Sequence, residues 1–326
     1  MLLAWQAAGA RQRADAPARE IAVTVDDLPT ASVLGNDLGR AQRTTAGLLA
    51  ALARRRVPAI GFVNETKLRT DGKVDDRRVA LLRQWIAAGL ELGNHTFSHV
   101  DFHTTPIASF QREVLDGETV TKNLLRASGR DIRYFRHPFL HTGRSAELRR
   151  SFDAFLKAHA YTVAPVTVDN SDYVFAAAYD RAVARDAGAG KPVAQADAGP
   201  PSTALPDPQQ IASAYIDYME SVVAYHEQQS VALLGRELRQ TLLIHANALN
   251  AATFDRLAAM LDRRGYRFVT LERALEDPAY SSPDEYYGPG GITWLHRWAL
   301  TQGKRGTFFA GEPAVPDWIE RASRGQ

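Results

Sequence analysis

The chain has 326 residues, of which 45% are hydrophobic and 23% charged, so it can bury a sizeable core and wholesale disorder is excluded. Its 39 basic and 37 acidic residues are mixed along the sequence, which argues against a nucleic-acid partner, and no run of about 18 apolar residues predicts a membrane span. Cysteine is absent, which excludes disulfides, thiolate metal sites and cysteine nucleophiles. Any metal ligands must therefore be His, Asp or Glu.

Two stretches are atypical of a packed domain. Residues 1–20 start with an apolar segment followed by small residues, as in an export signal, but the positively charged start of such signals is missing. We expect either an exported protein, periplasmic or secreted, or a cytoplasmic one whose frayed lead-in begins at an arbitrary point. Residues 186–208 are rich in Ala, Gly and Pro, which predicts a flexible surface insertion within the main domain.

Elsewhere, short apolar runs alternate with longer amphipathic ones, which is the pattern of a parallel α/β fold. The predicted strands are 21–25, 59–63, 90–93, 133–136, 161–168, 241–245 and 266–270. The predicted helices are 38–55, 75–88, 106–127, 144–159, 211–229 and 251–263. Several strands are apolar on both faces, so helices should cover both sides. These units predict one distorted (β/α) barrel of about seven parallel strands over residues 21–280.

Residues 281–326 follow this barrel and are rich in aromatic side chains, including Trp294, Trp298 and Phe308. We expect these rings to pack on the barrel helices, with stacking on sugar rings at a cleft as the alternative. Asn64, which follows the second strand, is expected to cap a helix, with substrate contact as the alternative.

Polar residues recur where the predicted strands end, and active sites of parallel α/β folds form at the carboxyl ends of their strands. These residues are Asp26 and Asp27 after the first strand, Asn94, His95 and His99 after the third, Arg136 and His137 at the fourth, Asp169, Asn170 and Asp172 after the fifth, and His245 and Asn247 at the sixth. Residue types needed for metal and acid–base chemistry therefore meet at one end of five strands.

Adjacent carboxylates at Asp26 and Asp27 repel each other, and a cation would relieve that cost, although Asp27 could merely cap a turn. His95 and His99 are spaced by four residues, which places both imidazoles on one side of a helical turn and within reach of one ion. The pair lacks the Glu of the zincin peptidase motif. His103, four residues further on, is expected to be an ordinary loop residue or an outer partner of the site.

Together, Asp27, His95 and His99 supply one oxygen and two nitrogens, which leaves positions for water and substrate as in a catalytic site. Such an ion lowers the pKa of bound water from about 15.7 towards roughly 7, and Asp26 is then the natural base. Two imidazoles and a carboxylate suit zinc but also accept cobalt, nickel or manganese.

These residues resemble the motifs of the polysaccharide deacetylases of the NodB-homology type, carbohydrate esterase family 4. The resemblance covers about residues 21–275. Five motifs occur in the family's order. TFDDGP resembles the segment 24–29, H[ST]xxH matches 95–99, the Arg and Pro-aromatic motif resembles 136–139, DxxDW resembles 169–173, and LxH matches 243–245. The resemblance implies a distorted barrel, often with seven strands.

Carried over by position, the resemblance implies Asp26 as general base, with Arg136 as its tether, and Asp27, His95 and His99 as metal ligands. His245 would be the general acid that protonates the departing amine, and Asp172 would orient it. Phe139 would offer a backbone N–H to the oxyanion, while Tyr173 and Leu243 would wall a pocket for the acetyl methyl. Three positions depart from the motifs: Leu28 replaces Gly, Tyr173 replaces Trp, and His137 replaces the usual residue beside the groove.

The sequence thus predicts a metal-dependent hydrolase that removes acetyl groups from N-acetylated amino sugars of a polysaccharide or oligosaccharide. One alternative is an O-acetyl carbohydrate esterase, which depends less on His245 because an alkoxide leaves more readily than an amine. The other is a non-catalytic carbohydrate-binding protein on the same fold, although binding alone needs neither Asp26 nor His245.

Overall fold

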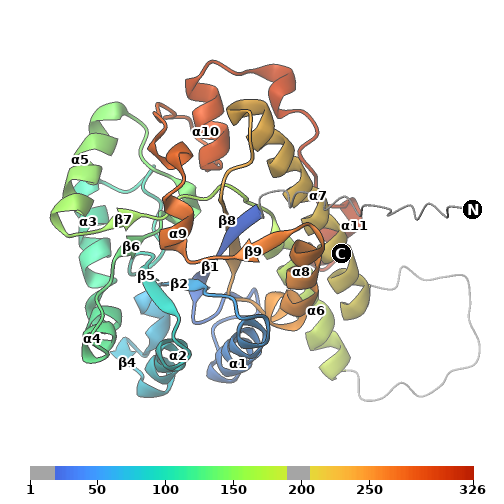
Figure 1. The fold of residues 1–326 in the computed structure, drawn as a ribbon. Helices are drawn as coiled ribbons and strands as arrows, with labels where there is room; N and C mark the ends of the chain where they lie inside the picture. Colours follow the sequence, from blue (N-terminus) through green and yellow to red (C-terminus); the bar gives the residue numbers. More distant parts are fainter. Residues whose placement is uncertain (1–18, 189–205) are drawn as a thin grey trace, which may run out of the picture.

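A computed structural model of the protein describes residues 19–188 and 206–326 (Figure 1). Most of the predicted lead-in at 1–20 and of the predicted insertion at 186–208 lies outside these residues. No helix within the described residues is both long and apolar enough to cross a membrane.

In the described chain, seven parallel strands form the central sheet, in the order β7-β6-β5-β2-β1-β8, and β9 pairs with the start of β1. They are β1 (Arg19–Leu28), β2 (Ile60–Val63), β5 (Glu91–Asn94), β6 (Tyr134–Phe135), β7 (Thr162–Val163), β8 (Gln240–His245) and β9 (Tyr266–Phe268). Each coincides with one of the predicted strands. The predicted fold class, a distorted (β/α) barrel, is confirmed.

The segment after β7 joins the two edges of the sheet. Ala164 N–H donates to Phe135 O of β6 at 2.8 Å, so the segment begins beside one edge. Four residues later, Val168 N–H donates to Thr241 O at 3.0 Å, and Leu243 N–H donates to Val168 O at 3.1 Å, so it ends beside β8. One extended segment therefore closes the sheet into an irregular barrel, which explains why only two of its residues form a regular strand.

Helices surround this barrel (Figure 1). They are α1 (Leu38–Arg55), α2 (Asp76–Ala87), α3 (Ile107–Asp116), α4 (Thr119–Ala127), α5 (Ala146–Ala158), α6 (Asp172–Gly188), α7 (Pro208–Leu234), α8 (Ala248–Arg263), α9 (Leu271–Leu275), α10 (Trp294–Thr301) and α11 (Asp317–Arg324). Short 3-10 turns lie at η1 (Glu65–Leu68), η2 (Pro138–Leu140), η3 (Pro278–Ser281) and η4 (Gly306–Phe309), and β3 (Arg69–Thr70) pairs with β4 (Lys73–Val74).

The predicted helix at 106–127 is two helices, because the chain breaks at Gly117 to pass the loop that follows β5. A Cβ on Gly117 would lie 2.6 Å from both Phe97 N and the carbonyl carbon of Thr96, so only glycine allows this approach. Phe97 N–H also donates to Glu113 O at 2.9 Å. The α3–α4 junction therefore supports the loop that carries His95 and His99.

The core lies between the barrel and its helices. Ile21, Val23 and Val25 of β1 are each at most 1% exposed, and Leu48 and Leu52 of α1 pack against them in one buried cluster. Burying side chains of this size contributes roughly 1.5–3 kcal/mol each. This buried core keeps the ends of the strands, which carry the polar residues, in fixed positions.

The chain beyond η3 packs on the barrel. Trp298 of α10 is 1% exposed and lies in a cluster with Leu238, Ala279 and Leu295. Trp294 packs against Leu140, Val166 and Leu243, while α11 packs on α6. These two tryptophans therefore pack against residues of the barrel and of the segments that surround it.

Candidate active site

The predicted site residues gather at the carboxyl ends of the strands. Asp26 lies near the end of β1, directly beside His245, the last residue of β8. His95 follows β5, and its backbone N–H donates to Val63 O of β2 at 3.0 Å. Arg136 follows β6. The parallel pairing of these strands therefore brings residues 26, 95, 136 and 245 to the same end of the barrel.

Asp27, His95 and His99 form a compact group of potential metal ligands. Asp27 Oδ1 lies 3.7 Å from His99 Nε2 and 3.9 Å from His95 Nε2, and the three ligand atoms lie within 4.8 Å of one another. Asp27 Oδ1 is buried and accepts no hydrogen bond within the described chain. An unsatisfied buried carboxylate oxygen facing two imidazoles fits the chemistry of a bound divalent cation.

The protonation states of the two imidazoles suit this role. His95 Nδ1 lies 2.8 Å from Arg136 O, and a carbonyl only accepts, so the proton is on Nδ1 and Nε2 keeps a free lone pair. Burial lowers the pKa of both His95 and His99 to about 4, which keeps the rings neutral. Burial acts to raise the pKa of Asp27, but Lys67 and His99 lower it below its usual value, so Asp27 is ionised.

The loop that carries these histidines is not helical, so the predicted helical turn at 95–99 is wrong. Thr96 and His99 have φ values of 65° and 60°, and Asp27 has a φ of 71°. Each such residue costs of order 1–3 kcal/mol and persists only where its surroundings impose it. The left-handed conformation at Thr96 and His99, and not the spacing of a helix, turns the two rings toward Asp27.

Asp26 is held in a buried, charged environment. It is 2% exposed, and its two oxygens lie 3.9 Å from Arg136 Nε and 3.7 Å from His95 Nε2. Burial raises the pKa of Asp26, and the positive charge of Arg136 partly offsets this effect. Arg136 is fully buried, and its Nη2 donates to Thr24 Oγ1 at 2.7 Å. Asp26 and Arg136 therefore form an ion pair without a direct hydrogen bond.

His245 and Asp172 are joined by two close polar contacts. His245 Nδ1 lies 2.6 Å from Asp172 Oδ1, and its backbone N–H donates to Asp172 Oδ2 at 2.8 Å. Asn250 Nδ2 donates to the same Oδ2 at 2.6 Å, and the pKa of Asp172 is lowered despite its burial. Burial acts to lower the pKa of His245, but Asp172 outweighs it and raises that pKa to about 10.

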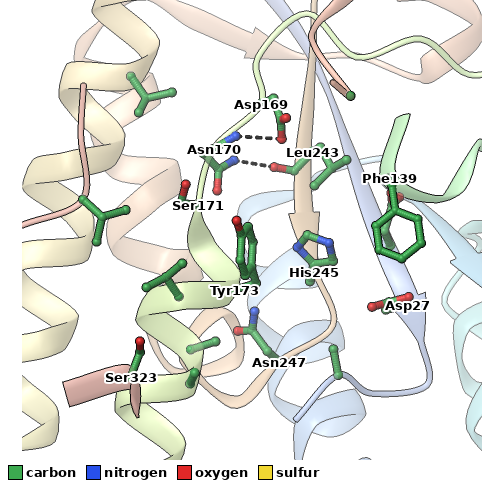
Figure 2. A pocket seen from close by; sticks show the side chains of 18 of the residues that line it. Asp27, Phe139, Asp169, Asn170, Ser171, Tyr173, Leu243, His245, Asn247 and Ser323 are labelled. Atoms are coloured by element: carbon green, nitrogen blue, oxygen red, sulfur yellow. Dashed lines mark hydrogen bonds between the residues drawn. The ribbon is translucent and has the colours of Figure 1, made fainter. Parts of the chain in front are cut away.

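One cavity of about 1070 Å³ extends between α6, α7 and the C-terminal residues 312–323, and it is lined by Asp26, Asp27, His95, His99 and His245. Figure 2 shows the side chains of Tyr173, His245, Phe139 and Asp27 around this cavity. The rings of Phe139 and Tyr173 are 53% and 60% exposed, whereas Leu243 is 4% exposed. Asn170 Nδ2 donates to Leu243 O at 2.7 Å and so fixes the start of α6 to β8 (Figure 2).

Three residues after β2 make contacts near the site, and one of them differs from expectation. Asn64 does not cap η1, because its side chain donates to His95 O at 2.6 Å. Glu65 accepts from the backbone N–H groups at Val120 and Thr121, at the start of α4. Lys67, which sequence analysis missed, has its Nζ 3.3 Å from Asp27 Oδ1 and donates to Asp27 O at 3.1 Å. Their position after a strand at the site end was the available signal.

Asp101, His103 and His141 form a second group of possible ligands. His141 Nδ1 lies 2.7 Å from Asp101 Oδ1, and the rings of His103 and His141 are stacked with centroids 3.8 Å apart. Parallel stacked rings direct their nitrogen lone pairs side by side rather than toward one point. This arrangement ties two loops together, as expected for His103 outside the main group.

The fold and this group of residues bring potential metal ligands and acid–base groups together at the carboxyl end of an α/β barrel. The pattern of the polysaccharide deacetylase family matches residues 13–153, a stretch that includes the first three motifs. The predicted resemblance to this family is thereby confirmed over residues 13–153.

Solved structures are also similar. A family 4 carbohydrate esterase pseudoenzyme from Bacillus anthracis is 14% identical, with 79% of this chain and 66% of that chain covered and a TM-score of 0.49. The peptidoglycan deacetylase PdaC from Bacillus subtilis is 19% identical (80% and 91% covered, TM-score 0.45). A family 4 carbohydrate esterase from Streptomyces lividans, in complex with acetate, is 17% identical (78% and 95% covered, TM-score 0.44). At these values, the likenesses carry no argument about this chain's activity.

Proposed function

We propose that the protein is a metal-dependent hydrolase that removes acetyl groups from N-acetylated amino sugars of a polysaccharide or oligosaccharide. The observation that carries this proposal is the contact of His245 with the buried Asp172, because His245 lines the same cavity as Asp26. An amine is a poor leaving group and must be protonated as the C–N bond breaks. A histidine whose pKa is raised to about 10 holds that proton at neutral pH.

In this proposal, Asp26 accepts the proton of the attacking water and His245 donates a proton to the departing nitrogen. Asp26 suits a base because its pKa is raised from its usual value, and an effective base has a pKa nearer the working pH. Arg136 holds the Asp26 carboxylate, and Asp172 orients the ring of His245. The proposed oxyanion donor is the Phe139 N–H, and the proposed walls of the acetyl methyl pocket are Tyr173 and Leu243, all three being residues that line the cavity.

Asp27, His95 and His99 would hold the divalent ion, with zinc preferred and cobalt, nickel or manganese as alternatives. When bound, such an ion polarises the acyl carbonyl and lowers the pKa of a coordinated water. The neutral imidazoles and the unsatisfied Asp27 Oδ1 support this assignment. The exposed rings of Phe139 and Tyr173 beside the cavity support a glycan substrate, because sugar rings present apolar C–H faces that pack on aromatic rings.

The test is acetate release from N-acetylated and O-acetylated glycans, measured with metal-stripped and metal-restored protein. We expect release from an N-acetylated glycan that requires metal. Replacing His245 by Gln should slow amide cleavage by roughly 10²–10⁴ and slow ester cleavage much less, because an alkoxide needs less protonation.

Other outcomes are distinguishable in the same assay. Release from O-acetylated glycans alone would show an esterase. Glycan binding without any acetate release, in the presence of each of the four metals, would show a binding protein and contradict the proposal.

A further inference from the structure

The chain beyond the barrel reaches the catalytic cavity at Gly291. A Cβ on this residue would overlap the carbonyl oxygen of Phe139 and would lie 2.9 Å from its carbonyl carbon and 3.3 Å from His141 Cδ2. Gly291 also lines the cavity. Since even the smallest side chain would collide with the Phe139 carbonyl, the position of this glycine and the position of the peptide unit between Phe139 and Leu140 are coupled.

The backbone at Phe139 is unusual in two ways. Phe139 and Leu140 both have a φ of 55°, a left-handed conformation that non-glycine residues rarely adopt. Phe139 N–H donates no hydrogen bond to any residue of the described chain, although the following N–H groups of Leu140 and His141 bond back to His137 O and Pro138 O. A strained backbone with a free donor beside a cavity is typical of a functional position.

The segment at 284–297 holds this strained turn in place. Arg297 is 1% exposed, forms an ion pair with Asp284 at 2.8 Å, and donates to Thr142 Oγ1 and, at 3.5 Å, to Leu140 O. Trp294 N–H donates to Val166 O at 2.7 Å.

Arg149 of α5 reinforces the same contacts. Its Nη1 donates to Asp284 O at 2.9 Å and its Nη2 donates to Thr142 Oγ1 at 2.8 Å. Both ends of the segment are therefore anchored, and Gly291 lies between them.

We propose that Gly291 is a positioning residue, through which the C-terminal segment 284–297 sets the direction of the Phe139 N–H. This inference rests on the proposed function, because it takes that N–H as the donor to the developing oxyanion. Such donors act only when they lie about 2.7–3.1 Å from the oxyanion, and removing one costs roughly 10²–10³ in kcat. The Phe139 N–H belongs to the preceding peptide unit, between Pro138 and Phe139, and the two units share the Cα of Phe139. A shift of the Phe139–Leu140 unit therefore turns this N–H out of alignment even if the fold is intact.

The matched variants are Gly291→Ala and Gly290→Ala. A Cβ on Gly290 would lie 3.5 Å from Tyr286 Oη and 3.7 Å from Ile292 Cγ2, both ordinary contacts. We expect Gly291→Ala to lower kcat by roughly 10–10³ with little change in KM or metal content. Its melting temperature should fall as for other overpacked positions, and Gly290→Ala should behave like the wild type.

A methylphosphonate ester of an amino sugar mimics the tetrahedral intermediate. Its binding therefore distinguishes a lost alignment of the Phe139 N–H from a general loss of structural support. In Gly291→Ala its affinity should fall in proportion to kcat, whereas the affinity for acetate should not change. Arg297→Lys is a second variant, because it keeps a positive charge beside Asp284 but loses the paired contacts with Leu140 and Thr142. Arg297→Lys should lose kcat and phosphonate affinity together, as Gly291→Ala does. The inference therefore stays testable if Gly291→Ala does not fold.

Equal kcat and equal phosphonate affinity in wild type and Gly291→Ala would overturn the inference and leave the proposed function standing. Equal losses in both glycine variants would also overturn it, because the segment would then act as general support. A wild-type protein that releases no acetate from any N-acetylated glycan would contradict the proposed function itself, and the inference with it.

Discussion

His245 donates its backbone N–H to one oxygen of Asp172 at 2.8 Å, while its ring nitrogen Nδ1 lies 2.6 Å from the other oxygen. The carboxylate is fully buried at the start of α6, and Asn250 also donates to it. This double contact fixes both the backbone and the ring of His245. It also places a negative charge against the imidazole, so the ring keeps its proton at neutral pH.

Replacing Asp172 by Asn should move the alkaline limb of the pH profile toward neutral pH. The pKa of His245 is raised to about 10, so a reaction that needs its proton declines only as pH rises through that value. Without the charge of Asp172, burial still acts to lower the pKa of His245. The ring therefore loses its proton at a lower pH than in the wild type. The fall in kcat/KM should be much larger at about pH 9 than at about pH 6.

The control for this experiment is Asp180→Asn, because Asp180 is a buried carboxylate of α6 on the same cavity, held by Ser32 rather than by a histidine. Its profile should keep the wild-type alkaline limb. An Asp172→Asn enzyme with an unshifted alkaline limb would remove His245 as the proton donor.

His99→Ala should abolish both bound metal and turnover. It removes one of three ligands, and even the loss of an outer partner of a ligand typically costs 10–100-fold in metal affinity. Elemental analysis of the purified variant checks this expectation. His103→Ala is the matched control, because it lies four residues further along the same loop but contacts His141 instead. Stoichiometric metal in His99→Ala would contradict the ligand assignment.

Lys67→Met should strengthen metal binding. The Lys67 ammonium lies 3.3 Å from Asp27 Oδ1 and repels a cation at the same oxygen. Two unit charges 4 Å apart interact by about 1 kcal/mol in water and about 4 at a protein surface, so we expect roughly a tenfold gain in affinity. Metal titration against a competing chelator measures it, with Lys122→Met, whose native partner is Glu118, as control. Weaker binding in Lys67→Met would instead make Lys67 a support for Asp27.

The sequence predicted the strands and the residues of the site more completely than their local geometry. Strand ends are readable because an apolar run stops at a polar residue, as at Asp26 and His245. The non-helical turn at His99 could not be predicted from the sequence, because a left-handed conformation at a non-glycine residue depends on the surrounding chain. Lys67 was missed because a lone lysine after a strand resembles a surface residue, and its direction is set by the turn η1.

Helix α6 shows a second limit of sequence reasoning. It begins at Asp172, directly after the fifth predicted strand, but residues 172–188 are not among the predicted helices. Alanine-rich segments without a clear apolar stripe give little periodic signal. The break of the helix at Gly117 was missed for a related reason, because a glycine inside an amphipathic stretch does not reveal which backbone passes beside it.

Gly117→Ala should therefore weaken metal binding as well as stability. The added methyl group would lie 2.6 Å from two backbone atoms of residues 96 and 97, so the loop carrying His95 and His99 must move. Overpacking of this kind typically costs about 1–3 kcal/mol, measurable as a lower melting temperature. Gly188→Ala is the control, since a Cβ there meets nothing within 4 Å. A destabilised Gly117→Ala variant that binds metal as tightly as the wild type would show that the loop shifts without moving its ligands.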